Sequence, residues 1–282
     1  MRVCLAALLA VCPSLVGAQQ FGLDSGLKAL RTADETKGWE AVGRLDIGDR
    51  AFCTGALIRP DLVLTAAHCL FDKESRQPYL ARDFVFRAGL RNGSAVATRG
   101  VVRVMAHPSY AYHGPESIET TAFDIALVQL DRPIDASAAT PYVTAGDPEP
   151  GDKVEVVSYA VDRAEAPSLQ QSCHVLPHQF GMDVFSCSVN FGSSGAPIFA
   201  MKGTRPEIIS VVSAKADLSG QQVSLGSRMA GPLADLQAAF DRPAPPKADL
   251  APPPVQVSAT DNTPLPQIRP ATPSAGAKFL KP

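Results

Sequence analysis

The sequence predicts an all-β protein, and two patterns lead to that prediction. Between Trp39 and Phe240, short β-branched and apolar runs such as LVLTAA, IALVQL and EIISVVSA are separated by Gly, Pro, Asp and Asn. Runs of about four to eight residues bounded by turn signals are typical of β-sandwiches and β-barrels. One strong helical pattern follows at 231–240 (GPLADLQAAF), where Leu233, Leu236 and Phe240 recur at helical spacing behind a proline. We therefore expect a β-fold with one C-terminal helix.

The first residues are typical of a secretory signal peptide. One Arg precedes an apolar run over 3–11, and small residues at 16–18 suit cleavage before Gln19. The apolar run is far shorter than the roughly 20 residues that span a bilayer, which argues against a membrane anchor. Lipid modification of Cys12 is the other alternative. We expect residues 1–18 to be removed and the protein to be secreted or periplasmic, with no membrane span.

Composition divides the rest of the chain into three segments. Residues 19–38 form an N-terminal segment or propeptide, with a second helical pattern at 25–34 (SGLKALRTAD). Residues 39–240 carry the β-type runs and are expected to form the folded domain. Residues 241–282 hold eleven of the 25 prolines and almost no apolar periodicity, which predicts a disordered Pro-rich tail. A linker, a stalk, a docking segment and a solvated tail all fit this composition.

Charge and cysteine content argue against several classes of function. The chain has 282 residues, 45% of them hydrophobic, and a formal net charge of -2. It can bury a sizeable core, and it lacks the basic excess of a protein that binds nucleic acid or acidic membranes. Removal of the signal leaves four cysteines: Cys53, Cys69, Cys173 and Cys187. An even number in an exported chain favours disulfides, and no C-x-x-C pair occurs, so we predict no metal site.

The first of three motifs that carry catalytic residue types is CTGALIRPDLVLTAAHCL, at 53–70. It brings His68 directly after the apolar strand LVLTAA. A disulfide between Cys53 and Cys69 would pin both ends of a strand pair and hold the loop that presents this histidine. Imidazole titrates near neutral pH, which suits a group that takes and returns a proton. His68 is therefore the candidate general base.

The other two motifs follow in order along the chain. TAFDIALVQLDRPI, at 121–134, has Asp124 at the start of an apolar strand, and GSSGAP, at 192–197, has Ser194 between two glycines. In residue type and order, the three motifs resemble the TAAHC, DIAL and GDSGGP segments of the chymotrypsin-like serine proteases. The resemblance covers roughly residues 39–240.

The resemblance implies a fold of two antiparallel six-stranded β-barrels, over about 39–135 and 148–240, packed face to face. His68 and Asp124 would come from the first barrel and Ser194 from the second. The cleft between the barrels would bind an extended polypeptide substrate, with no cofactor, and the protein would be a monomer.

The family's chemistry gives each of these residues a role. A serine hydroxyl is a weak nucleophile, so His68 would take its proton while Asp124 accepts a hydrogen bond from the other ring nitrogen. The backbone N–H groups of Gly192 and Ser194 would bind the developing oxyanion, each contributing about 3 to 4 kcal/mol. Ser213, in the strand ISVVSA, would bind the aspartate or the substrate backbone.

The sequence departs from trypsin-type enzymes before the nucleophile. Ser193 replaces the aspartate that receives the new α-amino group after zymogen cleavage, and no I-V-G-G type start precedes Trp39. We therefore expect that removal of a propeptide, if any occurs, forms no such ion pair. With Ser193 and Ala196, the chain looks more like bacterial members such as glutamyl endopeptidases.

Cleavage specificity stays open at the level of sequence. Cys173 and Cys187 are spaced as a family disulfide near the specificity pocket. The stretch SVNFGS contains no aspartate, which argues against a pocket for Arg or Lys. Val212 stands where glutamyl enzymes carry a histidine, which argues against Glu, whereas Lys215 could attract acidic side chains.

Two function classes follow. The first is a secreted serine endopeptidase that forms an acyl-enzyme on Ser194. The second is a catalytically latent protease-fold binding protein that acts through its surface and Pro-rich tail, with the Gly192 N–H flipped outward. The presence of His68, Asp124 and Ser194 together favours the first class, and an esterase is a weaker third option because the same site cleaves esters.

Overall fold

The computed structural model describes residues 26–114, 121–179, 181–218 and 221–242, and it confirms the all-β prediction. The expected signal peptide at 1–18 and the Pro-rich residues after 242 lie outside the described residues.

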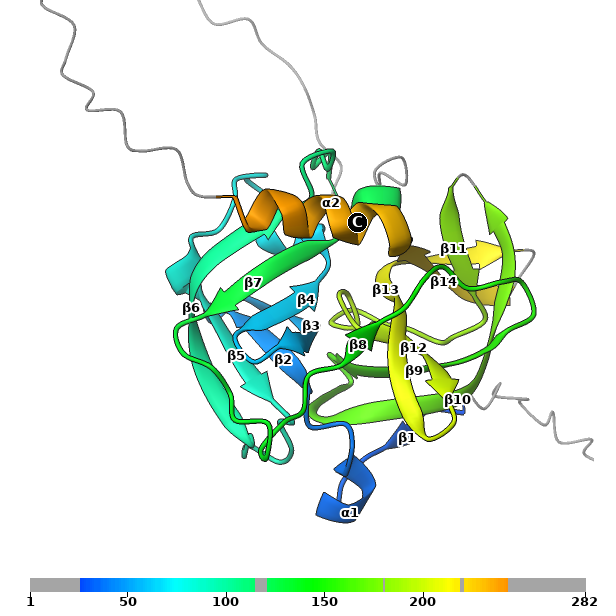
Figure 1. Cartoon of the computed structure of the whole chain (residues 1–282), viewed down its shortest axis with the longest axis horizontal. Coiled ribbons are helices and arrows are strands. Elements are labelled where there is room, and N and C mark those ends of the chain that lie inside the picture. The colour runs from blue at the N-terminus through cyan, green and yellow to red at the C-terminus, as the bar shows by residue number, and fades with distance from the viewer. Residues whose placement is uncertain (1–25, 115–120, 180, 219–220, 243–282) are drawn as a thin grey trace, which may run out of the picture. The chain divides into compact units, whose positions relative to one another are not determined.

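The first half of the chain forms a closed six-stranded barrel, blue to green in Figure 1. Its strands run in the order β2-β3-β4-β7-β6-β5, and every neighbouring pair is antiparallel. They are β2 (Val42–Ile47), β3 (Ala51–Arg59), β4 (Leu62–Thr65), β5 (Phe84–Ala88), β6 (Ala97–Ala106) and β7 (Ala126–Leu130), with the 3-10 helices η1 (Ala67–Leu70), η2 (Ala81–Asp83) and η3 (Thr121–Phe123) between strands. In β5, Phe84, Phe86 and Ala88 are buried in the barrel and the alternate residues are half-buried, as the period of two in a strand requires.

The second half forms an eight-stranded sheet. Six strands run in the order β10-β11-β14-β13-β12-β9, and a further pairing of β9 with β10 joins the two ends of this run. The strands are β9 (Lys153–Ala160), β10 (Arg163–Gln179), β11 (Met182–Phe185), β12 (Pro197–Lys202), β13 (Arg205–Leu218) and β14 (Gln221–Ser227), to which β1 (Lys28–Ala29) and β8 (Val143–Thr144) are added. The two-barrel architecture that the resemblance implies is therefore present, with two short additional strands.

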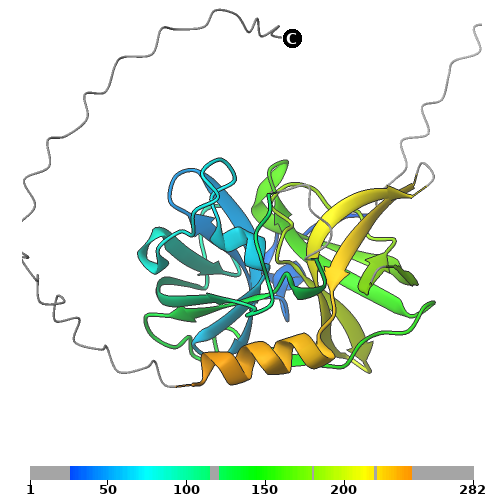
Figure 2. The same ribbon diagram turned by 90° about the horizontal axis from the view of Figure 1, so that it is seen from above.

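The C-terminal helix α2 (Ala230–Phe240) confirms the helical pattern and lies along both halves of the fold (Figures 1 and 2). Its apolar face, Leu233, Leu236 and Phe240, is buried, and the helix contacts β6 and β7. The carboxylate of Asp147 accepts the N–H of Ala230 at 3.1 Å and so supplies the cap that Met229 does not. No helix within the described ranges is long and apolar enough to cross a membrane.

The prediction of a helix at 25–34 is wrong. Residues Lys28–Ala29 form β1 and pair with β10, and the helix α1 covers only Ala33–Thr36. Leu30 is 2% exposed, and its N–H donates to the carbonyl of Pro167 at 2.8 Å. A short segment gains little from its own helical propensity, so pairing and burial against the folded domain decide its conformation.

Candidate active site

His68 and Asp124 lie in direct contact at one end of the first barrel. β4 ends at Thr65, just before η1, which carries His68, and Asp124 follows η3 just before β7. Because Thr65 pairs with Ala126, the two segments emerge side by side. Nδ1 of His68 lies 2.7 Å from Oδ2 of Asp124, and the backbone N–H of His68 donates to Oδ1 at 2.8 Å. When Nδ1 carries the proton for this bond, Nε2 is left as an acceptor.

Asp124 is buried and surrounded by donors. Its side chain is 4% exposed, and Oδ2 accepts a hydrogen bond from the hydroxyl of Ser213 on β13 as well as the contact from His68. The adjoining η3 is held by Ser227, whose hydroxyl donates to the carbonyl of Thr121 at 2.7 Å. Hydrogen bonds thus replace the water that this carboxylate loses on burial. Ser213 has the first of its two expected roles, a bond to the aspartate.

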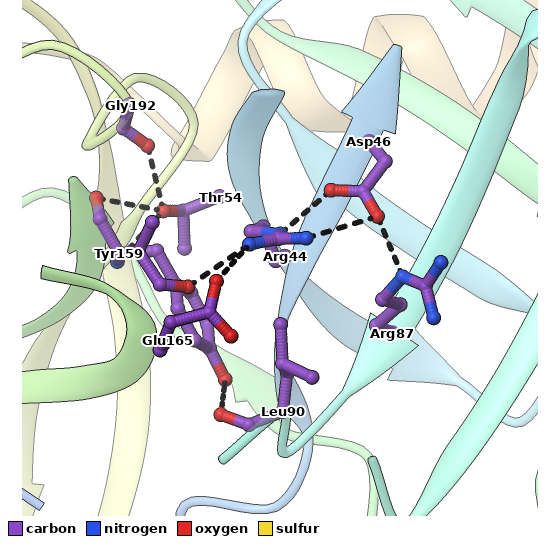
Figure 3. A network of polar contacts seen from close by, with 9 residues as sticks. Arg44, Asp46, Thr54, Arg87, Leu90, Tyr159, Glu165 and Gly192 are labelled. Carbon is purple, nitrogen blue, oxygen red and sulfur yellow. Dashed lines mark hydrogen bonds and ion pairs between the residues drawn. The ribbon is translucent and has the colours of Figure 1, made fainter. Parts of the chain in front are cut away.

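Thr54 of the first barrel holds the Ser194 loop, which connects β11 to β12. Its backbone N–H donates to the carbonyl of Ser194 at 2.8 Å, and its hydroxyl donates to the carbonyl of Gly192 at 2.9 Å (Figure 3). Gly195 has φ +79°, and a Cβ there would collide with the hydroxyl of Thr65 and the carbonyl of Thr54. Only glycine fits this close approach of the two halves.

Ser194 lines the same pocket as His68 and Asp124, which measures about 520 Å³. Both halves of the fold contribute to this pocket; Tyr110, Tyr112, Val189, Val212 and Lys215 are among the other lining residues. Between the described residues, no hydrogen bond joins the Ser194 hydroxyl to the His68 ring. In substrate-free active sites this bond is often long and tightens when substrate binds.

A tight turn at 190–193 shapes the backbone before Ser194. The N–H of Ser193 donates to the carbonyl of Asn190 at 2.9 Å. Gly192, the third residue of the turn, has φ +94°, whereas Phe191 is not among the residues with positive φ. This combination defines a type II turn, whose third position requires the conformation that glycine adopts freely.

The turn leaves two backbone amides available. The carbonyl of Phe191 accepts the N–H of Val161 at 2.9 Å, so in a trans peptide the Gly192 N–H points away from Val161. Within the part of the chain that the structure describes, neither the Gly192 N–H nor the Ser194 N–H donates to a protein acceptor. Both amides can therefore donate to a ligand.

A half-buried arginine contacts the residue before Ser194. Ser193 is fully buried, and its hydroxyl oxygen lies 3.2 Å from Nη2 of Arg163 and 3.2 Å from the carbonyl of Tyr159. The same Nη2 donates to Ser158 Oγ at 3.0 Å. The Arg163 side chain is 13% exposed, and burial lowers the pKa of its guanidinium from the ordinary value. A cation from within the chain thus anchors a loop that lacks the family's aspartate.

A polar network that includes Thr54 and Gly192 ties the two halves together (Figure 3). Arg44 of β2 lies 2.6 Å from Asp46 in its own barrel and donates to the carbonyl of Ala164, in the other half, at 3.1 Å. Tyr159 donates its hydroxyl to the carbonyl of Leu90 at 2.9 Å. These bonds fix the position of one half against the other, and residues of both halves line the pocket.

Both expected disulfides form. Cys53 pairs with Cys69 across 6.4 Å between Cα atoms, which ties η1 and His68 to β3, and Cys173 pairs with Cys187 across 4.9 Å. Among the described residues, the metal-like cluster consists of Cys53, His68 and Cys69. Because both sulfurs are consumed in the disulfide, they offer no thiolate to a metal ion.

The sequence motifs did not indicate the roles of two residues that contact the Ser194 loop. Thr54 follows a disulfide cysteine in a strand, and Arg163 lies just after a turn, so neither carries a local signal of its role. Each acts on the Ser194 loop from more than 25 positions away in sequence, a separation that only the fold closes.

A scan of protein families matches residues 31–226 to the trypsin family. Among curated proteins, the suppressor of tumorigenicity 14 protein homolog of Bos taurus is 33% identical over 96 residues, which is 32% of this chain and 10% of that protein. Trypsin of Sarcophaga bullata is 30% identical over 99 residues, 35% of each chain. The aligned part thus spans a tenth to about a third of the length of these relatives.

Several solved structures share the fold. A Glu endopeptidase in complex with MPD superposes with a TM-score of 0.62 and 16% identity over 78% of this chain and 98% of its own. The protease Anisep from Arthrobacter nicotinovorans superposes with a TM-score of 0.59 and 17% identity over 71% of this chain and 94% of its own. At such identities the likeness establishes the double-barrel fold.

Proposed function

The chain belongs to the trypsin family of serine proteases, and from that premise we propose that it is a secreted endopeptidase that hydrolyses peptide bonds through an acyl-enzyme on Ser194. The observation that carries the proposal is the pair of His68 and Asp124, joined at 2.7 Å in a pocket that Ser194 also lines. The substrate is a polypeptide, and the chemistry needs no cofactor.

In the proposed reaction, His68 acts first as a base and then as an acid. Nε2 accepts the proton of the Ser194 hydroxyl as Oγ attacks the carbonyl carbon, and the Asp124 carboxylate stabilises the imidazolium. Nε2 then gives this proton to the leaving amine as the C–N bond breaks. A water molecule next loses a proton to Nε2 and attacks the acyl carbon. Return of that proton to Ser194 Oγ releases the carboxylic acid.

The amides of Gly192 and Ser194 are proposed to bind the negative oxygen of the tetrahedral intermediates. The type II turn and the contact between Phe191 and Val161 support this role, because they leave both N–H groups free of protein acceptors among the described residues. A latent binding protein, the competing function, would require the Gly192 N–H to point outward.

The proposed substrate-binding element is the edge of β13. β12 pairs with β13 as far as Val211, and beyond that point the described pairing of β13 is with β14 on its other side. Residues 212–215 line the pocket, so an extended peptide can add to this edge through main-chain hydrogen bonds. Ser213 would then serve both of its expected roles.

We also propose that activity requires no new N-terminus. The contact of Arg163 with Ser193 supports this, because the cation that holds the Ser194 loop, Arg163, is already part of the folded domain. The test is a short extension attached before Gln19. We expect kcat/KM to match that of protein beginning at Gln19. A loss of activity that is restored when the extension is cut off would contradict the proposal.

The first experiment for the function is labelling with a fluorophosphonate probe, followed by mass spectrometry. We expect the probe on Ser194 in protein lacking residues 1–18, no label in Ser194→Ala, and unchanged label in Ser137→Ala, a serine outside the pocket. No labelling of folded protein with both disulfides formed would reject the endopeptidase and favour the binding protein.

Secretion and the monomeric state are proposals with direct tests of their own. N-terminal sequencing of exported protein should begin at Gln19, and light scattering should give the mass of one chain. A retained N-terminus would contradict the signal peptide.

A further inference from the structure

The pocket beside Ser194 carries two lysines on one exposed aromatic ring. Phe191 is 61% exposed, and the ammonium groups of Lys73 and Lys215 lie 5.5 and 4.6 Å from its ring centroid. Lys73 comes from the first half, in the loop after η1, and Lys215 lies on β13, two residues after Ser213. All three side chains belong to residues that line the pocket. The two halves of the fold therefore bring two cations together at the cleft.

No acidic side chain within the described ranges forms an ion pair with either lysine. Asp72, the neighbour of Lys73, accepts a hydrogen bond from the Tyr79 hydroxyl at 2.9 Å instead. The pocket's own carboxylate, Asp124, is buried and held by His68. The accessible charge that the described residues present in this pocket is therefore positive.

Part of the pocket lining is apolar. Val189 and Val212 line it and are buried, so neither supplies a group that could recognise a charged side chain. Recognition of a charged side chain then falls to Lys73 and Lys215, the two cations that line the pocket. Two like charges beside one ring repel each other, and an anion that enters between them relieves this repulsion while it gains attraction from both.

We propose that this pocket selects polypeptides with an acidic side chain next to the scissile bond, and that Lys73 and Lys215 recognise that side chain. The inference rests on the proposed endopeptidase function and specifies its substrate class. An Asp or Glu carboxylate near Phe191 meets both ammonium groups, whereas a substrate Lys or Arg is repelled by them. The two lysines come from opposite halves, so the acidic residue can lie on either side of the scissile bond.

The test compares matched quenched fluorescent peptides that differ by Glu, Gln or Lys at positions flanking the cleaved bond. At low salt we expect kcat/KM for the best Glu peptide to exceed that of its Gln counterpart by about fivefold to twenty-fold, with the Lys peptide slowest. High salt should reduce the preference because it screens exposed charges. Equal values for the Glu and Gln peptides at every position would overturn the proposal.

Variants assign the preference to the lysines. Lys73→Gln and Lys215→Gln should each lower the Glu/Gln ratio by up to about fivefold, and the double variant should bring the ratio close to one. Lys202→Gln is the matched control, because this lysine lies at the β12–β13 turn outside the pocket, paired with Glu207. An unchanged Glu/Gln ratio in the double variant would show that other residues recognise the acidic side chain. It would reject the assignment of this role to Lys73 and Lys215.

Fluorophosphonate labelling separates failure of this inference from failure of the proposed function. The lysine variants should still label at Ser194, because the probe carries no acidic side chain for the lysines to recognise. Labelling without any preference for Glu would reject the acidic substrate class alone. Absence of labelling in the wild-type protein would reject the endopeptidase itself.

Discussion

Nη2 of Arg163 lies 3.2 Å from the hydroxyl oxygen of Ser193, the residue directly before the proposed nucleophile. Ser193 is fully buried and the Arg163 side chain is only 13% exposed, so solvent screens this contact little. If the guanidinium moved, Ser193 would lose one of its hydrogen-bond donors. Ser193 also closes the 190–193 turn, which contains Gly192. In the proposed reaction, we therefore expect the arginine to act through the position of the Ser194 loop.

Replacing Arg163 with methionine should lower kcat at least tenfold and leave KM little changed. The estimate follows from a charged hydrogen bond in a buried setting, worth about 1.5 to 3 kcal/mol. The measurement is kcat and KM corrected for the fraction of labelled Ser194. Arg163→Lys should recover part of the loss, and Arg99→Met, at a half-buried arginine outside the pocket that contacts the Pro133 carbonyl, should have no effect. Wild-type kcat in Arg163→Met would refute the role.

Thr54→Val should destabilise the protein and slow the enzyme, because the hydroxyl of Thr54 bridges the two halves. It donates to the Gly192 carbonyl at 2.9 Å and accepts the Tyr159 N–H at 3.0 Å. Leaving these buried groups unpaired should cost about 1 to 3 kcal/mol of unfolding free energy, measured by urea denaturation. Thr54→Ser keeps the hydroxyl and serves as the control. Equal stability and kcat/KM in the two variants would contradict this reasoning.

Asp124→Asn and Ser213→Ala should lower kcat to very different extents. The first replaces the carboxylate itself, and the second removes a hydroxyl that donates to it. The first change removes the charge that orients His68 and should lower kcat by about 10⁴-fold, as in the general triad mechanism. The second removes one hydrogen bond of several and should cost about tenfold. The measurement is kcat at saturating substrate. A loss of less than tenfold in Asp124→Asn would argue against the triad.

Asp183 should make the stability of the protein depend on pH. It is fully buried in β11, and burial raises the pKa of its carboxyl from 3.8 to about 6, although His178, 3.2 Å away, opposes the shift. A raised acid pKa means that the fold favours the neutral form. Burial of the neutral Asp183 carboxyl therefore contributes to the free energy of unfolding below about pH 4. This contribution is lost as pH rises through about 6, because the buried carboxyl then becomes charged.

Asp183→Asn, which stays neutral, tests this directly. Compared with wild type, the variant should gain about 2 to 3 kcal/mol of unfolding free energy at pH 8 relative to pH 4, measured by denaturant titration at both values. His178→Gln removes the neighbouring ring and should move the transition to higher pH. A stability difference between Asp183→Asn and wild type that is the same at both pH values would refute the raised pKa.

Local sequence was enough to predict the elements whose pattern is complete within a few residues. The alternating and apolar runs indicated the strands, and the spacing of Leu233, Leu236 and Phe240 indicated α2, because one side of each element must be buried. The pattern at 25–34 failed for the opposite reason. Its few apolar residues gain more from pairing with β10 and from burial of Leu30 than from a lone helix.

The motifs around His68, Asp124 and Ser194 were visible because their chemistry requires specific residue types beside glycines, a cysteine and apolar strands. Sequence by itself therefore determined the all-β class, the C-terminal helix and the candidate catalytic residues. Only the tertiary structure decided which residues support them. Thr54 and Arg163 hold the Ser194 loop, and Lys73 and Lys215 each contact the Phe191 ring, through contacts between positions far apart in the chain. Such contacts leave no periodic or local signal, because the packing of the two halves alone creates them.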